Sequence, residues 1–472
     1  MLRIITQQTD VRGELQRICV RSGRDFPGEH RVVDPKGYSQ DEQLLLEEKP
    51  RAARLHQEAT VREILLAVKR QGNQAVIDYT AEFNGQILTP EELKVSGSQL
   101  DAAYQQVSKP LLKAIRLAAR QIEAFHRQRV PKSWVHFGDD EVVLGKRYTP
   151  VDSAGIYIHG GRTAYPSAVL MNGIPAKVAG VPRMVMVTPM RGMGKDINPA
   201  ILVAAQEVGI HEIYRIGGVQ AIAAMAYGTE TIGKVDLIVG GGDIYISLAK
   251  KQLFGCVGTD SLTETSEMVI IADDTANPIN VATDLIAQAE REPMAAAILF
   301  TTDAGLAKNV YVAIERQLVD HPRRVETEKS LAHYGLIVVV ESLKAAAELV
   351  NDFAPARLEL QVEDAWEILP LIRHAGAIFL GHGTPEVVGD YLAGPSHTLP
   401  TCGSARFNSP LSVETFLKHS SIIQYSPSAL RKIAGAIDIL ANADDFPSHA
   451  DAVRRRLQAE NLELDGDDLL GQ

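Results

Sequence analysis

Residues 212–227 read EIYRIGGVQAIAAMAY and contain, in order, an apolar run, a glycine pair and a second apolar stretch. The run at 212–216 is short and bounded by glycine, which favours a β-strand. The stretch at 220–227 combines alanine with larger apolar residues over two turns, which favours a buried helix. A strand that passes through a tight turn into a helix is the repeating unit of α/β proteins. This stretch therefore decides the fold class.

The same alternation of strand and helix patterns continues on both sides, from Tyr148 to about Asp390. The expected strands fall into two successive series. The first comprises Gly155–Ile158, Met184–Thr188, Glu212–Ile216 and Leu237–Val239, and the second comprises Met268–Ala272, Ala296–Phe300, Leu336–Val340 and Ala377–Leu380. Helices are expected between them at Asn198–Val208, Gln220–Tyr227, Ile279–Arg291 and Ala304–Gln317. We therefore expect an α/β fold with two doubly wound parallel sheets, each with helices on both faces.

The two ends of the chain have a different, mainly helical character. Apolar residues recur at three- and four-residue spacing in Arg54–Phe83 and Gln99–Arg129, and helical patterns return at Ser426–Ala441 and His449–Glu460. The polar, turn-rich stretch Arg24–Tyr38 is expected to be a surface excursion or an extended arm. The expected division is a mainly helical region at 1–145, two α/β domains at 146–265 and 266–395, and a small C-terminal region at 396–472.

Composition narrows the class of protein. The chain has 472 residues, 45% hydrophobic and 23% charged, and a net charge of −11, which argues against a nucleic-acid or anionic-membrane binder. The three cysteines, Cys19, Cys256 and Cys402, are far apart and form no CxxC pair, so neither a disulfide framework nor a thiolate zinc site is expected. With no apolar run long enough to span a bilayer, we expect a cytoplasmic protein.

Three glycine-rich turns follow expected strands of the first series. They are Gly160-Gly161, Gly217-Gly218 and Gly240-Gly241-Gly242. Glycine allows the backbone to approach a phosphate closely, and a helix N-terminus favours negative charge. Such turns at the carboxyl ends of parallel strands mark the usual ligand crevice of an α/β sheet. Because none is a strict GxGxxG, tight turns that only serve packing remain the alternative.

Several blocks in a fixed order make a family resemblance specific. They are residues 164–180 (AYPSAVLMNGIPAKVAG), 217–228 (GGVQAIAAMAYG), 266–273 (SEMVIIAD), 288–290 (QAE), 389–401 (GDYLAGPSHTLPT) and 403–407 (GSARF). Together they resemble the histidinol dehydrogenases over roughly Thr60 to Leu457.

The resemblance implies a homodimer in which each chain has two Rossmann-like domains and small terminal regions, the C-terminal one contributing to the partner subunit's site. It implies an oxidoreductase of histidine biosynthesis that oxidises L-histidinol through the aldehyde to L-histidine with NAD and zinc. In that family zinc orients the substrate, a glutamate activates water and histidines move protons.

Carried over residue by residue, the cofactor positions are largely retained. Tyr157 and Gln220 match NAD-contacting positions, whereas Asp243 stands where the family has asparagine. That exchange places a carboxylate near a pyrophosphate and is expected to weaken binding unless a cation lies nearby. Ser266 matches a substrate-contacting serine, and Asp444 stands where the family has a glutamate that meets the substrate's amino group.

The implied zinc site is incomplete. Gln288, Asp390 and His449 match three family ligands, but the fourth position, a histidine in the family, is Arg291. Arginine offers no lone pair and stays protonated, so it cannot be a ligand. Three remaining ligands could still form an open zinc site in principle.

The implied acid–base pair is missing. Residues 351–360 read NDFAPARLEL, so Ala356 and Arg357 stand where the family has Glu-His after Ala-Pro. Alanine carries no acid–base group and arginine cannot accept a proton, while His397 matches a second family histidine. A positioned general acid or base accelerates the chemical step roughly a hundred- to ten-thousandfold. The oxidation of histidinol is therefore expected to be slow, above all its second step.

Three interpretations of the altered site follow. Two guanidinium groups beside Ser266 and His397 suit an anionic alcohol in place of the aminoalcohol. Alternatively, Arg291 and Arg357 pair with Asp390 and Glu292 and fill a pocket that has lost its metal, as in an inactive ligand-binding or interaction subunit. Finally, other residues could sustain histidinol oxidation. The residues expected to line the substrate site are Ser266, Gln288, Arg291, Arg357, Asp390, Asp444 and His449.

Overall fold

The computed structural model describes residues 2–5, 11–15, 18, 40–160, 164–190, 196–262 and 265–466. The chain forms two compact units, one of residues 1–129 with 151–416 and one of residues 130–150 with 417–472. The excursion predicted at Arg24–Tyr38 lies outside the described residues. The four-part division predicted from the sequence stays a prediction. No helix in the described ranges is both long and apolar enough to cross a membrane.

The first sheet of the larger unit confirms the predicted first series of strands. Its order is β6 (Glu212–Tyr214), β5 (Arg183–Val187), β4 (Ser153–Tyr157), β7 (Leu237–Val239) and β8 (Gly258–Thr259), all parallel. The helices that connect these strands are α6 (Pro166–Ala179), α7 (Pro199–Val208), α8 (Gly218–Tyr227) and α9 (Ile244–Leu253). The short edge strand β8 was not predicted, because two residues carry no detectable periodicity.

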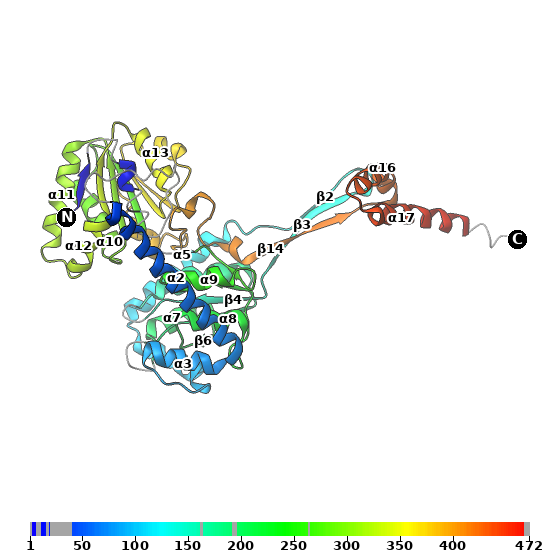
Figure 1. Ribbon diagram of the computed structural model, residues 1–472, viewed down its shortest axis with the longest axis horizontal. Coiled ribbons are helices and arrows are strands. Elements are labelled where there is room, and N and C mark those ends of the chain that lie inside the picture. The colour runs from blue at the N-terminus through cyan, green and yellow to red at the C-terminus, as the bar shows by residue number, and fades with distance from the viewer. Residues whose placement is uncertain are drawn as a thin grey trace. The chain divides into compact units, whose positions relative to one another are not determined.

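The second sheet has six parallel strands. Their order is β1 (Arg3–Ile5), β11 (Gly335–Val339), β10 (Ala296–Thr301), β9 (Glu267–Ala272), β12 (Arg357–Gln361) and β13 (Ala377–Leu380). The helices are α10 (Pro278–Ala289), α11 (Ala304–Leu318), α12 (Arg324–Tyr334), α13 (Leu343–Phe353) and α14 (Ala365–Ile368). One apolar cluster joins the sheet to α10, α11 and α12, and another joins it to α13. Figure 1 shows these helices beside the sheet.

The interior strand β12, which lies between β9 and β13, was missing from the predicted series, and its composition explains why. Its residues read RLELQ, and all five are buried. Leu358 and Leu360 belong to the apolar cluster beneath α13. Arg357, Glu359 and Gln361 alternate with them, so they face the opposite side of the sheet. A strand buried on both faces normally consists of apolar residues, and this one has a polar side.

The N-terminal helices pack on helices α6 to α9, which flank the first sheet. They are α2 (Gln40–Gln71), α3 (Asn73–Asn84), α4 (Gly97–Gln106) and α5 (Lys109–Arg127). Gly72, with φ of 55°, separates the first pair, which falls within the helical segment predicted at Arg54–Phe83. Ser108 caps the N-terminus of α5 through its side chain. Val61, Ile64 and Leu65 of α2 belong to the apolar cluster of the first sheet, which fixes this helix on that domain.

The smaller unit is built from an antiparallel sheet and two helices. The strands run in the order β14 (Leu417–Gln424), β3 (Val143–Pro150) and β2 (Trp134–Phe137), followed along the chain by α16 (Pro427–Ala443) and α17 (Pro447–Gly466). The two helices confirm the predicted C-terminal helical patterns. Several large apolar side chains of this unit are exposed, among them Phe137, Ile423 and Ile439.

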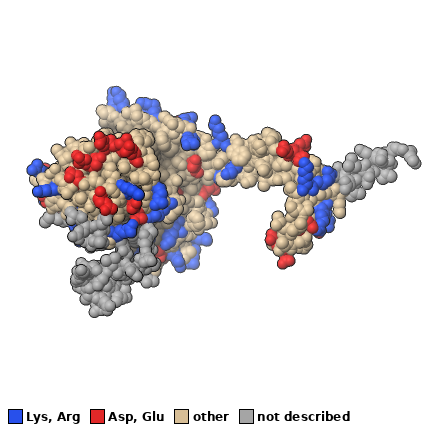
Figure 2. Space-filling view, turned by 90° about the horizontal axis from the view of Figure 1, so that it is seen from above, with Lys and Arg blue, Asp and Glu red and all other residues tan. Residues whose placement is uncertain are grey.

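Charged side chains of both signs cover the larger unit. Figure 2 shows acidic and basic residues intermixed on the face that it presents. Many of the ion pairs described on this unit join exposed groups, such as Arg324 with Glu328. Exposed pairs of this kind contribute little to stability, about 0–1 kcal/mol each.

Gly240, directly after β7, is expected to tolerate no side chain. Its φ is 109°, and an added Cβ would overlap the carbonyl oxygen of Tyr157 on the neighbouring strand β4. Gly240→Ala is therefore expected to lower the free energy of unfolding by at least about 1–3 kcal/mol, the cost of backbone strain alone. Denaturant unfolding measures this. Gly97→Ala is the matched control, since no atom lies within 4 Å of its added Cβ; equal effects of the two changes would contradict the prediction.

Candidate functional site

The predicted cofactor residues Tyr157 and Gln220 meet at the carboxyl edge of the first sheet. Tyr157 is the last residue of β4, and its hydroxyl accepts a hydrogen bond from the backbone N–H of Gly218, 3.2 Å away, at the start of α8. Burial, together with the charge of Asp243, raises the pKa of the Tyr157 hydroxyl far above its usual value. The ring therefore stays neutral and holds the glycine turn against the sheet.

Gln220 is the strongest sign of a ligand at this edge. Its side chain is fully buried, and neither its Oε1 nor its Nε2 has a hydrogen-bond partner among the described residues. An unpaired buried amide is costly and rare, so this side chain is a candidate contact for a bound polar group. Gly218 has a φ of 73°, and an added Cβ would lie 2.6 Å from Gln220 Oε1. The glycine therefore leaves room for this amide at the N-terminus of a ten-residue helix.

Asp243 has a local partner. It is the N-cap of α9, and its Oδ1 accepts hydrogen bonds from the backbone N–H groups of Tyr245 and Ile246 at 3.0 and 3.2 Å. The carboxylate thereby occupies the helix terminus that could otherwise bind a phosphate. The residues present fit a nicotinamide dinucleotide at Tyr157, Gln220 and the start of α8, and less well at the start of α9.

The predicted substrate residues of the larger unit gather at the amino edge of the second sheet. Ser266 immediately precedes β9, and Arg357 is the first residue of the neighbouring strand β12. Gln288 lies in the last turn of α10, and Arg291 follows that helix. Asp390 lies in the short helix α15 (Val387–Tyr391). Parallel strands bring their amino ends to one edge, which explains why residues so distant in sequence meet here.

Arg291 and Arg357 form an ion-pair cluster with two carboxylates. Arg291 Nη2 contacts Asp390 Oδ2 and lies 2.9 Å from Glu386 Oε1. Arg357 Nη2 lies 3.1 Å from Asp390 Oδ1, and its Nε lies 2.8 Å from Glu386 Oε2. Burial disfavours ionisation of Asp390, yet the two guanidinium groups hold the pKa of this carboxyl below its usual value. The cluster therefore contains two positive and two negative charges.

The cluster reaches Ser266 and Gln288 through hydrogen bonds. Arg357 Nη1 donates to Ser266 Oγ at 3.1 Å. Gln288 Nε2 donates to the same oxygen at 3.2 Å and to the carbonyl of Ala296 at 3.3 Å. Ala356 is fully buried, so its side chain offers neither an acid–base group nor open space.

His397 stands beside this cluster with a defined tautomer. Its Nδ1 lies 3.1 Å from the backbone carbonyl oxygen of Asp390, which can only accept, so Nδ1 carries the proton. Burial lowers the pKa of His397 to about 4, although the Asp390 carboxylate opposes this shift. The imidazole is therefore neutral near pH 7, with Nε2 as a lone-pair acceptor.

The sequence did not lead us to Glu386, and Glu292 was expected instead to pair with the two arginines. Glu292 Oε1 instead accepts a hydrogen bond from the backbone N–H of Ser266, 3.0 Å away. Glu386 is fully buried and pairs with both arginines. The four-residue spacing of Glu386 and Asp390 was the available signal, because residues four apart share one face of a helical turn.

A buried carboxyl pair lies deeper along the polar side of β12. Glu359 Oε1 accepts from the backbone N–H of Glu386, and its Oε2 accepts from Gln361 Nε2, both at 2.7 Å. Gln361 Nε2 also donates to Asp284 Oδ2 of α10 at 2.9 Å. Burial and the Asp284 carboxylate raise the pKa of Glu359 to about 8, and burial raises the pKa of Asp284 to about 6. This pair therefore retains a proton at neutral pH.

Glu359→Gln is expected to reduce the loss of stability as pH rises from about 5 to 8. The folded-state pKa of Glu359 exceeds its unfolded value, so its contribution is full at low pH and fades as pH rises through the folded pKa. Glutamine retains a hydrogen-bonding side chain without titrating. Denaturant unfolding across this range measures the effect, with the exposed Glu363→Gln as control. Parallel profiles for wild type and Glu359→Gln would contradict this assignment.

The residues do not fit the zinc ion that the resemblance implies. Both carboxylate oxygens of Asp390 contact guanidinium nitrogens, and Gln288 is bonded to Ser266 and Ala296. Within the described part of the chain, no group of three or more His, Cys, Asp or Glu side chains could hold a metal. His449 belongs to the smaller unit, where its ring stacks on Phe446 at 4.8 Å between centroids. Asp444, the C-cap of α16, belongs to the same unit.

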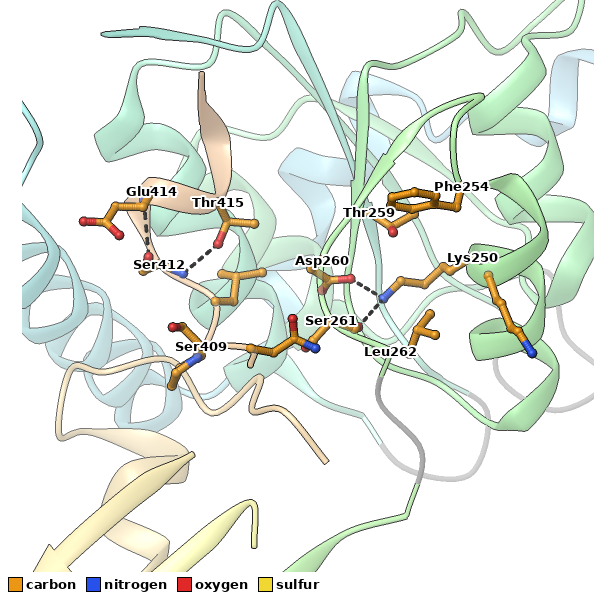
Figure 3. Close-up of a pocket in the computed structure, with 14 residues that line it drawn as sticks. Lys250, Phe254, Thr259, Asp260, Ser261, Leu262, Ser409, Ser412, Glu414 and Thr415 are labelled. Atoms are coloured by element: carbon orange, nitrogen blue, oxygen red, sulfur yellow. Dashed lines mark hydrogen bonds and ion pairs between the residues drawn. The ribbon is translucent and has the colours of Figure 1, made fainter. Parts of the chain in front are cut away.

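A separate cavity of about 540 Å³ lies between α9 and the segment 408–415. Figure 3 shows Lys250 reaching from α9 toward Asp260 at its wall. Lys250 Nζ contacts Asp260 and donates to the carbonyls of Gly240 and Ser261 at 3.1 Å each, so the pair is satisfied. None of the predicted site residues lines this cavity.

Comparisons with known proteins extend over nearly the whole chain. The family model described as histidinol dehydrogenase matches residues 47–457. The chain is 69% identical over 460 residues to "Histidinol dehydrogenase 2" of Trichormus variabilis, covering 98% of this chain and all of that one. It is 61% identical to "Histidinol dehydrogenase" of Thermosynechococcus vestitus, over 97% of this chain and all of that one. The crystal structure of histidinol dehydrogenase from Elizabethkingia anophelis matches with a TM-score of 0.84 at 33% identity, covering 97% of this chain and 98% of that one.

Proposed function

This chain belongs to the histidinol dehydrogenase family, and on that basis we propose that it is an NAD-dependent oxidoreductase that oxidises L-histidinol to L-histidine in histidine biosynthesis. The observation that carries the proposal is the unbroken match over both sheets and the smaller unit. The anionic-alcohol alternative is not favoured, because each guanidinium group that suggested it already contacts two carboxylates.

The cofactor half of the site supports this proposal. The Gln220 amide and the N-terminus of α8 would hold polar groups of the dinucleotide, with Tyr157 fixing the glycine turn between them. When bound, NAD would accept the hydride that leaves the carbinol carbon. A Gln220→Leu variant would remove this amide while preserving most of its volume.

We assign His397 as the proton acceptor of the first oxidation. As the hydride leaves carbon, the alcohol O–H bond breaks and its proton passes to His397 Nε2, which leaves an aldehyde. The Nδ1–H bond to the Asp390 carbonyl keeps the acceptor nitrogen free. Ser266, held by Arg357, would contact the substrate. Because Ala356 supplies no base for water addition, the aldehyde is expected to persist longer than in relatives with a glutamate there.

A homodimer and a cytoplasmic location complete the proposal. The smaller unit exposes Phe137, Ile423 and Ile439 at 74%, 70% and 71%, an apolar surface that suits a second copy of the chain. Asp444 and His449 lie in that same unit and would complete the partner's substrate site. The substrate itself is a small molecule, and no nucleic-acid or membrane partner is proposed.

Formation of NADH from L-histidinol by the purified full-length protein tests the proposal. We expect measurable turnover, with free aldehyde trapped by a hydrazine reagent. Gln220→Leu is expected to raise the KM for NAD about tenfold, the loss of one good polar contact of about 1.4 kcal/mol, with little change in kcat. Gln252→Leu, whose side chain bonds to the Glu58 carbonyl, serves as control. Absence of NADH from a folded protein would refute the proposed reaction.

A further inference from the structure

The two carboxylates at the centre of the site require positive charge from their surroundings. Glu386 is completely buried, and the Asp390 side chain is only 11% exposed. Both reach the same pair of cationic side chains, so their oxygens lie close together. Two ionised carboxylates at such short range and away from water are stable only beside compensating cations.

The guanidinium groups supply that charge in a closed arrangement. Arg291 contacts Glu386 through Oε1 and Asp390 through Oδ2. Arg357 contacts Glu386 through Oε2 and Asp390 through Oδ1. Each arginine bridges both carboxylates, and each of the four carboxylate oxygens faces one guanidinium nitrogen. Three of these oxygens accept guanidinium hydrogen bonds, whereas Glu386 Oε2 lies 2.8 Å from Arg357 Nε without a hydrogen bond between them. Both oxygens of Asp390, the predicted metal ligand, are therefore occupied by guanidinium groups.

We propose that Arg291 and Arg357 together replace a divalent metal ion, so that this centre is metal-free and self-neutralised. The resemblance places neutral imidazoles at both positions in the family. Each arginine adds one positive charge, and the two together add the charge of one zinc ion beside Glu386 and Asp390. The proposal concerns charge and metal content only, and it holds or fails independently of activity on L-histidinol.

The two arginines are then interdependent. Arg291→His alone removes one of the two positive charges that compensate the carboxylate pair. Arg357→His alone does the same. Replacing both removes the bridging cations and frees the oxygens of Asp390. The double variant is therefore expected to be less stable than wild type without metal and to regain stability when zinc binds.

Metal analysis and thermal unfolding of the full-length protein test this proposal. After equilibration with zinc and removal of the excess, we expect wild type to retain less than about 0.1 zinc per chain, and its Tm to be unaffected by zinc or EDTA. The Arg291→His/Arg357→His variant is expected to bind about one zinc per chain and to show a Tm that zinc raises by several degrees. Arg454→His, on the exposed face of α17, is the matched control and should behave like wild type.

Two outcomes would overturn the inference. Stoichiometric zinc in wild type, with a Tm that falls on chelation, would mean that the arginines do not replace the metal. A folded double variant whose Tm does not respond to zinc would mean that their charge is not what excludes it. If the double variant fails to fold, the metal content of wild type still decides the question. Inactivity toward L-histidinol, by contrast, would affect only the proposed function.

Discussion

Replacing Arg357 with leucine is expected to lower the free energy of unfolding by about 3–5 kcal/mol. The change removes one of two cations that neutralise Glu386 and Asp390 and leaves a buried carboxylate uncompensated. It also removes the donor to Ser266 Oγ. Urea or guanidinium unfolding, followed by circular dichroism, measures the loss.

Two further variants make this prediction specific to charge. Arg324→Leu removes an exposed ion pair with Glu328 and should cost no more than about 1 kcal/mol. Adding Glu386→Gln to Arg357→Leu should recover part of the loss, because it removes the stranded negative charge. An Arg357→Leu variant as stable as Arg324→Leu would show that the cluster is not a coupled buried network.

Replacing His397 with glutamine is expected to reduce NADH formation from L-histidinol about a hundred- to ten-thousandfold. Glutamine can hydrogen-bond to the Asp390 carbonyl but cannot accept a proton. Because the pKa of His397 is held at about 4, protonation of this group should not reduce wild-type activity between about pH 8 and pH 5. Steady-state kinetics across this range measures both effects.

The accompanying readouts separate proton transfer from structural damage. The KM for NAD and the Tm of His397→Gln should stay close to wild type, since the cofactor residues lie on the other sheet. His211→Gln, at an exposed position before β6, should leave activity unchanged. Activity of His397→Gln within about tenfold of wild type would exclude His397 as the principal proton acceptor.

The regular parts of the fold followed from local sequence patterns. Short apolar runs, three of them before glycine turns, predicted β4 to β7, and the alternation predicted two parallel sheets. β12 was missed because Arg357, Glu359 and Gln361 interrupt its apolar character, and their burial depends on partners from α10 and α15. Periodicity reports which side of an element is apolar, not whether a polar side has been covered.

The site was predictable as a set of residues but not as a network. The family blocks located Ser266, Gln288 and Asp390, and the exchanges at 291 and 357 ruled out the usual chemistry at those positions. Glu386 was not predicted, because its four-residue spacing from Asp390 indicates a shared face but not which cations lie opposite. Only the convergence of β9, β12, α10 and α15 at one sheet edge defines which charges meet.

The two-sided character of β12 also restricts how the second sheet can assemble. Its pairing with β9 sets Arg357 opposite Met268 and Glu359 opposite Ile270. A slip by one residue would turn three polar side chains into the apolar cluster beneath α13 and two leucines toward α10. Misaligned pairings of β12 would therefore cost free energy, so the polar side of this strand specifies its register with β9.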